Sequence, residues 1–548
     1  MKNLMERGTK CLIVQSRFST FGFWNYVDVC KIAGAKYPAA PLGLMTVAAL
    51  LPQQWEFRLI DENVEPLREE HLAWADIVCV GGMLSQQKGM LSLIDRAHGY
   101  SLPVVLGGPD PTSQPHLYRS ADYLVLGEGE SSIPLFLADL EKGCRGGEYR
   151  SDEKPDMTKA VVPRFDLVRF EDYVQVGIQF SRGCPFSCEF CDVTELYGRR
   201  PRTKSAEQVL KEMETLFDLG YRGHIDFVDD NFIGDRRRAK DVLVALRAWS
   251  GAHHHPFYFS TESSINLAQD DDLLQLMKDL DFRYLFVGIE TPDADLLTMT
   301  KKTNNVHVSV THAVRKIASY GMIVNAGFIL GFDNERDNTG DAMKRCIQDA
   351  GIPIAMVGKL YALPRTQLTQ RLEREGRLFE NPSTLSDSVI DQTTSGPNFI
   401  TSRPRVAVLR DHVDVLRYVY DPARYYDRVL TTCLALRPAG RYRPRAAKIL
   451  KHIRVFFTLC AVIGFNRTTG WLYWKTLAMV GIKNPGAIEA AVNLAAMFIH
   501  FQKHSRFVID ATNREIESLE SLARENSLRE CVGPGELPVL ISLVSATA

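Results

Sequence analysis

No uncharged hydrophobic run in this sequence reaches the roughly 18 residues that a membrane-spanning helix needs. The most apolar stretches, residues 455–465 and 487–501, are too short or carry a charge. The N-terminal residues 1–7 also lack the apolar core of a signal peptide. These absences predict a cytoplasmic protein, and they leave open a peripheral contact with a membrane surface.

An excess of one charge is missing as well, because 65 Lys and Arg residues balance 66 Asp and Glu residues. A nucleic-acid-binding protein would have a strongly basic domain, so no nucleic-acid partner is expected. Eleven cysteines are few for 548 residues and odd in number, which indicates reduced thiols and not a disulfide framework. At roughly 150 residues per domain, the length predicts three domains.

Three of the few cysteines lie close together, at Cys184, Cys188 and Cys191. Thiolates hold iron–sulfur clusters, usually four to a cubane, and the nearest other cysteines are Cys144 and Cys346. One iron of a cubane would therefore lack a protein ligand and could bind a substrate or cofactor. A structural zinc site is the weaker interpretation, because it needs four ligands, typically in paired CxxC units, and no second pair is present.

This CxxxCxxC run, with an aromatic residue just before its last cysteine, resembles the radical S-adenosylmethionine (SAM) superfamily. The resemblance implies that the three cysteines hold a 4Fe–4S cluster whose open iron chelates SAM. It also implies reductive cleavage of SAM to a 5′-deoxyadenosyl radical, fed by an external one-electron reductant such as flavodoxin or ferredoxin. In such chemistry the cofactors carry the hard step, and the protein orients and shields it.

Residues 1–150 alternate short apolar runs with amphipathic stretches, which predicts a Rossmann-like α/β domain with a parallel sheet. Ligands bind such sheets at the carboxyl ends of the strands, where glycines cluster in this sequence. No GxGxxG motif follows the first strand, so a dinucleotide site is not expected. The predicted strands are 11–15, 57–61, 77–81, 104–107 and 123–127, and the predicted helices are 41–51, 87–98 and 130–142.

The order of these elements, with the segments 41–44, 61–63, 107–112 and 127–130, resembles the cobalamin-binding domain that precedes many radical SAM cores. No histidine follows the first strand, so a histidine-ligated cobalt is not expected. The alternative is that the glycines only make tight turns and the domain binds nothing. By resemblance, the residues placed beneath or beside the corrin are Leu84, Ser85, Gly107, Gly108, Gly127 and Glu128.

After a linker at 151–175, residues 176–385 are predicted to form six strand–helix units of a partial (β/α)6 barrel. The expected strands are 178–181, 224–228, 257–260, 284–287, 324–330 and 356–360. Polar residues at the carboxyl ends of barrel strands point at the site, although a single acid such as Asp229 could equally cap a helix. By resemblance, the residues that bind SAM are Asp230, Asn231, Glu262, Glu290, Gly327 and Gly331.

Residues 386–548 are predicted to form a mainly helical accessory or substrate domain. A loop is expected at 386–399, and helices at 406–420, 454–465, 469–480 and 485–507. This region resembles the C-terminal domain of hopanoid C-methylase-like proteins. A basic stretch within it is most simply a solvated helix face, or else it contacts a membrane surface or an anionic substrate: Arg437, Arg441, Arg443, Arg445, Lys448, Lys451 and Arg454.

The resemblance as a whole implies a cobalamin-dependent radical SAM C-methyltransferase that acts on an unactivated carbon through methylcobalamin and a 5′-deoxyadenosyl radical. The small-molecule substrate could be a hydrophobic polycyclic or lipid-like compound, and a tetrapyrrole or an antibiotic precursor is equally compatible. Two alternatives stay open. One is a rearrangement, cyclisation or oxidation enzyme that uses cobalamin as an electron relay, and the other is a cobalamin or redox sensor.

The cysteine motif generates a direct test. We expect Cys188→Ala to abolish SAM cleavage, because the cluster loses one of its three protein ligands, while corrin binding stays largely intact. Formation of 5′-deoxyadenosine and the absorption spectrum of the bound corrin measure the two effects. Retained cleavage in this variant would contradict the cluster assignment.

Overall fold

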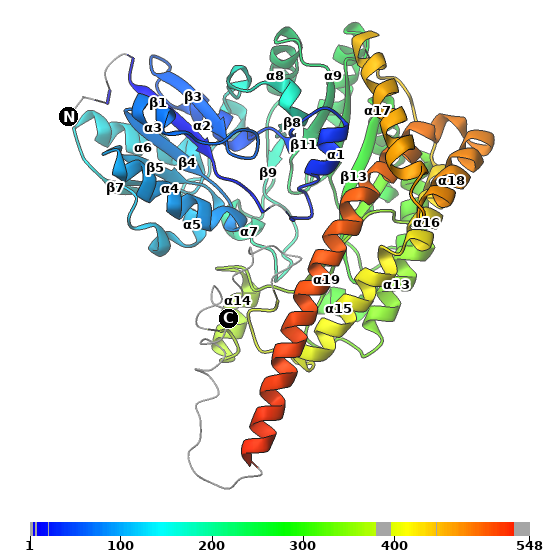
Figure 1. Cartoon of the computed structure of the whole chain (residues 1–548). Coiled ribbons are helices and arrows are strands. Elements are labelled where there is room, and N and C mark those ends of the chain that lie inside the picture. The colour runs from blue at the N-terminus through cyan, green and yellow to red at the C-terminus, as the bar shows by residue number, and fades with distance from the viewer. Residues whose placement is uncertain (1–3, 6–7, 20, 380–395, 445, 531–548) are drawn as a thin grey trace.

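The computed structural model describes residues 4–5, 8–19, 21–379, 396–444 and 446–530, and most of the loop predicted at 386–399 lies outside these residues. Two parallel sheets stand side by side, and a layer of helices covers the second of them (Figure 1). The protein is therefore α/β at its N-terminal and central parts and helical at its C-terminal part, as predicted.

The first sheet has the strand order β3-β1-β4-β5-β6-β7, and all its strand pairs are parallel. Its inner strands are almost wholly apolar because helices cover both faces, and all five predicted strands are present. Its elements are β1 (Lys10–Gln15), α2 (Leu42–Leu50), β3 (Glu56–Asp61), α3 (Glu69–Trp74), β4 (Ile77–Gly81), α4 (Gln87–Gly99), β5 (Val104–Gly107), α5 (Pro109–Ser113), β6 (Tyr123–Leu126), α6 (Gly129–Glu141) and β7 (Gly147–Arg150).

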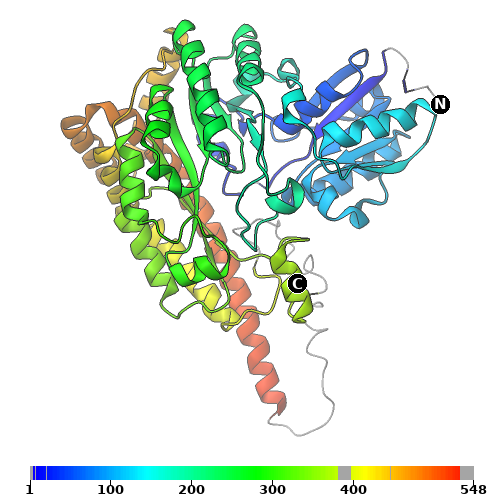
Figure 2. The same ribbon diagram turned by 180° about the vertical axis from the view of Figure 1, so that it is seen from behind.

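The second sheet is parallel and curved, with the order β15-β14-β13-β12-β11-β8-β2. Figure 2 shows its helices on the outside of the curve. Its elements are β8 (Tyr173–Ile178), α8 (Ala206–Asp218), β11 (Gly223–Phe227), α9 (Arg236–Ala252), β12 (Phe257–Glu262), α10 (Asp271–Asp279), β13 (Phe282–Glu290), α11 (Ala294–Met299), α12 (Val310–Ser319), β14 (Ile323–Leu330), α13 (Thr339–Ala350), β15 (Ala355–Lys359) and α14 (Gln367–Arg374).

Two features of this sheet differ from the prediction. Its first strand is β8 and not residues 178–181, because the chain leaves the sheet after Ile178 and forms the short strand β9 (Ser181–Arg182), which pairs with β10 (Arg202–Thr203). A seventh strand, β2 (Tyr37–Ala39), comes from the N-terminal third and pairs with β8. Helix α1 (Val27–Ile32), just before β2, contacts β2 and therefore lies beside the central sheet, whereas residues 16–18 still contact the first sheet.

Side chains alternate between the two faces of the curved sheet. Ile225, Phe227 and Phe259 are fully buried on the outer face, where they pack against helices in the main core. Asp226 and Ser260 are each adjacent in sequence to one of these residues and bond to each other on the inner face. The polar inner face and the apolar outer face identify the inside of the curve as the place for chemistry.

The C-terminal helices are α15 (Arg405–Val419), α16 (Pro422–Ala435), α17 (Ala446–Gly464), α18 (Gly470–Lys483) and α19 (Ile488–Glu530). Two predicted helices were too short, because α17 begins at Ala446 and α19 continues to Glu530. In the described part of the chain, no helix combines the length and the apolar character needed to cross a bilayer.

Helix α19 packs along α15 and α16 and also contacts α1, so it joins the two edges of the open barrel (Figure 1). Three buried histidines lie along this packing. His412 bonds to the carbonyl of Val357 on β15, and His500 bonds to the carbonyl of Phe23. Burial lowers the pKa of His412 to about 3 and the pKa values of His500 and His504 to about 4.

These histidines predict how stability depends on pH. The unfolded chain binds protons with a pKa near 6.5 and the folded chain does not, so their contribution is complete above pH 6.5 and falls as the pH drops toward 4. In that window, each histidine should lower the free energy of unfolding by about 1.4 kcal/mol for every unit that the pH falls. The free energy of unfolding, measured by urea titration between pH 7.5 and 5, should depend less steeply on pH in the double variant His500→Gln/His504→Gln than in wild type. His312→Gln, at an exposed site, should keep the wild-type slope.

Candidate active site

The three cysteines lie on the loop that follows β9, at the carboxyl end of β8. Gly183 begins this loop with φ +89°, and a Cβ atom there would lie 2.7 Å from the carbonyl oxygen of Gly198. Only glycine fits such a position. The amide of Cys184 donates to that same carbonyl at 3.3 Å, and the amide of Cys191 donates to the carbonyl of Cys188 at 3.2 Å. The loop is thus folded tightly on itself.

Three consecutive side chains after β11 hold the cysteine loop. Asp229 is fully buried and accepts hydrogen bonds from the backbone of Phe180 and Ser181. The carboxylate of Asp230 accepts from the amide of Gly183 at 3.1 Å. The amide of Asn231 lies 3.9 Å from the sulfur of Cys184. In this structure Asp229 therefore supports the loop backbone and caps no helix.

A largely buried lysine that sequence reasoning missed lies beside the thiols. Lys302 donates to Glu290 at 2.8 Å and is within electrostatic reach of all three cysteines. Burial alone would lower the pKa of Lys302, but the nearby carboxylate and thiols outweigh it and raise the pKa. Burial raises the pKa values of the three thiols.

The three thiols interact with one another as well, since Cys188 lies within electrostatic reach of Cys184 and of Cys191. Within the described part of the chain, no three His, Cys, Asp or Glu side chains converge as ligands of one metal ion do. Ligands of a cubane bind three different irons, so they need not meet at one point. Three neighbouring sulfurs, one of them buried and two partly buried, beside a cation fit a cluster better than they fit a single ion.

Glu262, at the end of β12, lies inside the curve of the sheet. The side chain is exposed to solvent, although protein surrounds much of it. Asp226, Asp230 and Asp229 lie near its carboxylate. The surrounding protein, reinforced by these acids, disfavours the charged form and raises the pKa of Glu262 to about 8. Among the residues that the structure describes, its carboxylate has no hydrogen-bond or ion-pair partner. It can therefore accept a cationic ligand.

Glu290 and the two predicted glycines have different surroundings. Glu290 has a φ of +67° and is paired with Lys302. A Cβ atom on Gly327 would lie 3.2 Å from the ring of Phe286, so Gly327 faces the inside of the curve. The amide of Gly331 donates to Glu335 at 2.8 Å in a turn with φ +100°. These residues do not form one cluster.

Aromatic side chains from the N-terminal third border the same interior. Trp24 packs edge-on against Phe286 with ring centroids 5.0 Å apart, although it is half exposed. His224 stacks on Tyr258 and bonds to Ser260 at 2.7 Å. The inner face thus offers both aromatic surface and hydrogen-bonding groups to a substrate.

The carboxyl ends of β4, β5 and β6 lie side by side at one end of the first sheet, which is called its carboxyl edge below. A Cβ atom on Gly107 would lie 2.7 Å from the carbonyl oxygen of Val125, and on Gly108 it would lie 2.9 Å from the amide of Gly82. A side chain at either position would clash with the neighbouring backbone, which explains why both residues are glycine. Gly127, with φ +83°, makes a turn. Leu84 and Ser85 lie half-buried in a short turn after β4.

Glu128 has a different environment from the one expected of a corrin contact. Its side chain is only 2% exposed and forms ion pairs with Arg182 at 3.0 Å and Arg202 at 2.7 Å. Arg182 also forms a two-pronged pair with Glu130. Since Arg182 lies two residues before Cys184, this ion-pair network joins the edge of the first sheet to the start of the cysteine loop.

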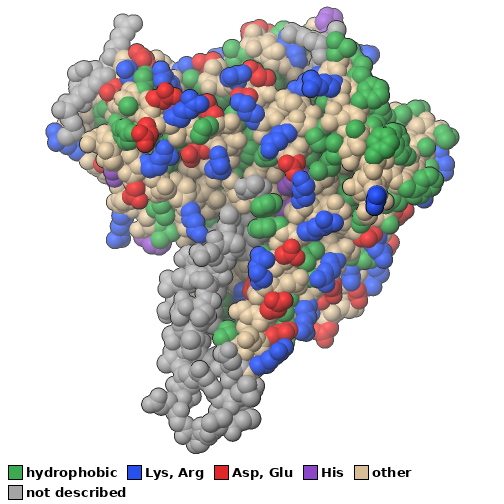
Figure 3. Space-filling view, viewed as in Figure 1, with side chains coloured by type: hydrophobic (Ala, Val, Ile, Leu, Met, Phe, Trp, Pro, Cys, Tyr) green, Lys and Arg blue, Asp and Glu red, His purple; other side chains and the backbone are tan. Residues whose placement is uncertain are grey.

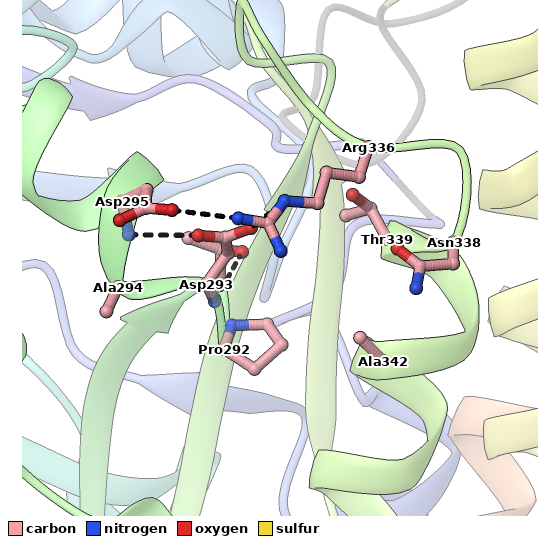
Figure 4. A pocket seen from close by; sticks show the side chains of 9 residues that line it. Pro292, Asp293, Ala294, Asp295, Arg336, Asn338, Thr339 and Ala342 are labelled. Atoms are coloured by element: carbon pink, nitrogen blue, oxygen red, sulfur yellow. Dashed lines mark hydrogen bonds and ion pairs between the residues drawn. The ribbon is translucent and has the colours of Figure 1, made fainter.

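A hollow on the rim of the second sheet lies between the start of α11 and the start of α13 (Figure 4). Arg336 crosses it to pair with Asp293 at 3.5 Å and Asp295 at 2.8 Å. The charged side chains of this hollow pair with one another, and none of the predicted site residues lines it.

Comparison with known families supports this geometry. Residues 30–137 match the B12 binding domain, residues 178–346 the radical SAM superfamily, and residues 366–514 a domain of unknown function, DUF4070. An uncharacterized methyltransferase of Synechocystis is 39% identical over 93% of this chain and 95% of its own length. The chain belongs to the cobalamin-dependent radical SAM methyltransferases. Its cofactors are a 4Fe–4S cluster, SAM and cobalamin.

One further relative and two solved structures are also similar to this chain. The hopanoid C-2 methylase of Rhodopseudomonas palustris is 35% identical over 79% of this chain and 82% of its own. The methyltransferase TsrM of Kitasatospora setae, solved with cobalamin and a 4Fe–4S cluster, matches with a TM-score of 0.57 and 16% identity over 88% of this chain and all of that one. The cobalamin-dependent radical enzyme OxsB matches with a TM-score of 0.57 and 15% identity over 93% of this chain and 81% of that one. The two solved structures confirm the fold.

The residues missed from the sequence, Lys302 and Arg182, carry little sequence signal. Lys302 lies 12 positions from its partner Glu290, and Arg182 lies 52 positions from Glu130. Neither spacing follows a helical or strand period. Only the position of Arg182 beside the cysteine motif could have marked it as a candidate.

The ion-pair network predicts a large effect of one substitution. Arg182→Gln leaves Glu130 without the cation that pairs with it, whereas Glu128 keeps Arg202, and removing one partner of a buried pair costs about 3 kcal/mol or more. We expect this loss in the free energy of unfolding, measured by urea titration. Arg200→Gln changes an exposed arginine near the same loop and should stay within about 0.5 kcal/mol of wild type. Equal stability of the two variants would contradict the network.

Proposed function

We propose that this enzyme transfers a methyl group to an unactivated carbon of a hydrophobic polycyclic or lipid-like small molecule. The observation that carries the proposal is the ion-pair network of Arg182, which joins the loop of the three cysteines to the edge of the B12 binding domain. A relative 35% identical over 79% of the chain is a hopanoid C-2 methylase, which supports a polycyclic lipid as the substrate class.

In this proposal Cys184, Cys188 and Cys191 hold the cluster, and residues nearby bind SAM. Glu262 receives the ammonium group of SAM, because its carboxylate is unpaired and surrounded by acids. Lys302 lies beside the thiols and offers a positive charge to the carboxylate of SAM. Glu290 acts through Lys302, which it orients.

Asp230 and Asn231 act mainly by fixing the loop, through Gly183 and Cys184 respectively. Gly327 admits the adenine ring on the inner face of β14, and Gly331 ends that strand in the turn that closes the pocket. When bound, the cluster and SAM supply the radical and cobalamin supplies the methyl group. The chain supplies orientation and a site that excludes bulk water.

The carboxyl edge of β4, β5 and β6 is the proposed seat of cobalamin. Leu84 and Ser85 are the candidates for its lower face, and Gly107, Gly108 and Gly127 allow the backbone to turn there. Glu128 serves this site indirectly, because its charge is taken up by Arg182 and Arg202. In this way Glu128 helps to hold the carboxyl ends of β4, β5 and β6 next to the cysteine loop.

The substrate would lie within the curve of the second sheet, between the two cofactors. Trp24, Phe286 and Tyr284 offer apolar and aromatic surface there, and Asn493 of α19 bonds to the hydroxyl of Tyr284 at 3.1 Å. An external flavodoxin or ferredoxin in the cytoplasm would provide electrons. Peripheral contact with a membrane is the remaining part of the proposal and would bring the enzyme to a lipid substrate.

Product analysis separates methylation from the competing radical reactions. Under anaerobic reduction with substrate, a methylase forms S-adenosylhomocysteine and 5′-deoxyadenosine in equal amounts, because one SAM donates the methyl group and another generates the radical. We expect this one-to-one ratio, measured by liquid chromatography with mass detection. 5′-Deoxyadenosine without S-adenosylhomocysteine would favour rearrangement or oxidation instead. No SAM consumption would favour a sensor.

A further inference from the structure

Exposed apolar side chains are concentrated on one small part of this protein. Of the 21 large hydrophobic side chains that are exposed in the described residues, ten lie between residues 449 and 488. Such a concentration on a protein surface marks a site of interaction. The members on α17, α18 and the start of α19 are Ile449, Leu450, Ile453, Phe457, Val462, Phe465, Trp471, Trp474, Ile482 and Ile488.

Several of these side chains are more exposed than any packing role would allow. Phe465 is 82% exposed, Trp471 is 76% exposed and Ile482 is 83% exposed. The opposite sides of the same two helices are well packed, since Leu459, Ile463 and Tyr473 are buried in the main core. The helices are therefore firmly seated and turn an apolar face outward. Figure 3 shows these green side chains gathered over α17 and α18.

The charges around this face have one sign. Between Asp427 and Glu489 the sequence contains no acidic residue, although it contains 11 Lys and Arg residues. Arg454, Arg467, Lys475 and Lys483 are exposed, and none of them forms an ion pair with a described residue. Long basic side chains at the rim of an apolar surface can keep their charged ends at the level of lipid headgroups.

A shallow apolar groove crosses the same face. Among the residues whose side chains the structure describes, Pro444, Ile449, Ile453, Phe456 and Phe457 line it, and none of these is charged. Nearby, Lys451 donates to the carbonyl of Gly34, so the start of α17 is fastened to the segment that carries α1.

We propose that the outward face of α17 and α18 docks on an anionic phospholipid surface. Apolar side chains enter the boundary between headgroups and acyl chains, and the basic side chains pair with the phosphates. Helices of this kind lie in the plane of the interface and do not span it. Charge complementarity selects this partner over a second copy of the chain, because two uniformly basic faces would repel each other. The inference does not depend on methyl transfer.

The test is sedimentation of the full-length, cluster-reconstituted enzyme with lipid vesicles. We expect binding to vesicles of equal parts phosphatidylglycerol and phosphatidylcholine to be at least about tenfold tighter than to pure phosphatidylcholine. Arg454→Gln/Lys475→Gln/Lys483→Gln should lose about fivefold for each cation that contacts the surface, on the anionic vesicles only. Phe457→Ser/Phe465→Ser/Trp471→Ser should weaken binding at least about tenfold.

Matched substitutions elsewhere separate this effect from a general loss of surface charge or apolar area. Lys211→Gln/Arg237→Gln removes exposed cations, and Leu135→Ser/Val244→Ser removes exposed apolar side chains. Both control variants should bind like wild type, and iron content and circular dichroism check that every variant is folded. Failure of wild type to bind anionic vesicles would overturn the proposal. So would undiminished binding by both patch variants, or a dimer in light scattering that these variants dissociate.

Discussion

Arg182 shares its guanidinium between Glu128 and Glu130 of the B12 binding domain and lies two residues before the first cysteine of the radical SAM domain. All three side chains are largely or fully withdrawn from water, so their charges depend on one another. Two cofactors can act on one substrate only if their sites keep a constant separation. This ion-pair network provides that constraint at the point where the cysteine loop begins, and the remaining features of the site are arranged around it.

The carboxylates of the site fall into two groups. Asp229, Asp230 and Glu290 already have donors in the protein, namely the loop backbone and Lys302. Glu262 has no donor among the described residues, and the surrounding protein and neighbouring acids raise its pKa to about 8. Paired carboxylates stabilise the loop, whereas an unpaired one in such surroundings gains most from a cationic ligand. The presence or absence of a donor therefore distinguishes the carboxylates that build the site from Glu262, which is available to bind a ligand.

The C-terminal helices have two faces with different tasks. The inner sides of α15 and α19 complete the open barrel, with His412 and His500 bonded to backbone carbonyls of distant segments. The outer side of α17 and α18 is apolar and basic. In the proposed docking, this outer side places the enzyme on a lipid surface. Closure of the barrel and access to lipid would then be functions of one helical layer.

The sequence by itself determined the cysteine loop, the strand order along the chain and the carboxylates that end β11, β12 and β13, because each depends on local spacing and hydrophobic pattern. It also identified α2, α4, α6 and α15 closely, but not β2, the start of α17 or the length of α19. Tertiary structure alone decided that β2 joins the second sheet, that Lys302 lies beside the thiols and that Glu128 pairs with Arg182. Those contacts join residues far apart in the chain, where no period or motif records which side chains will meet.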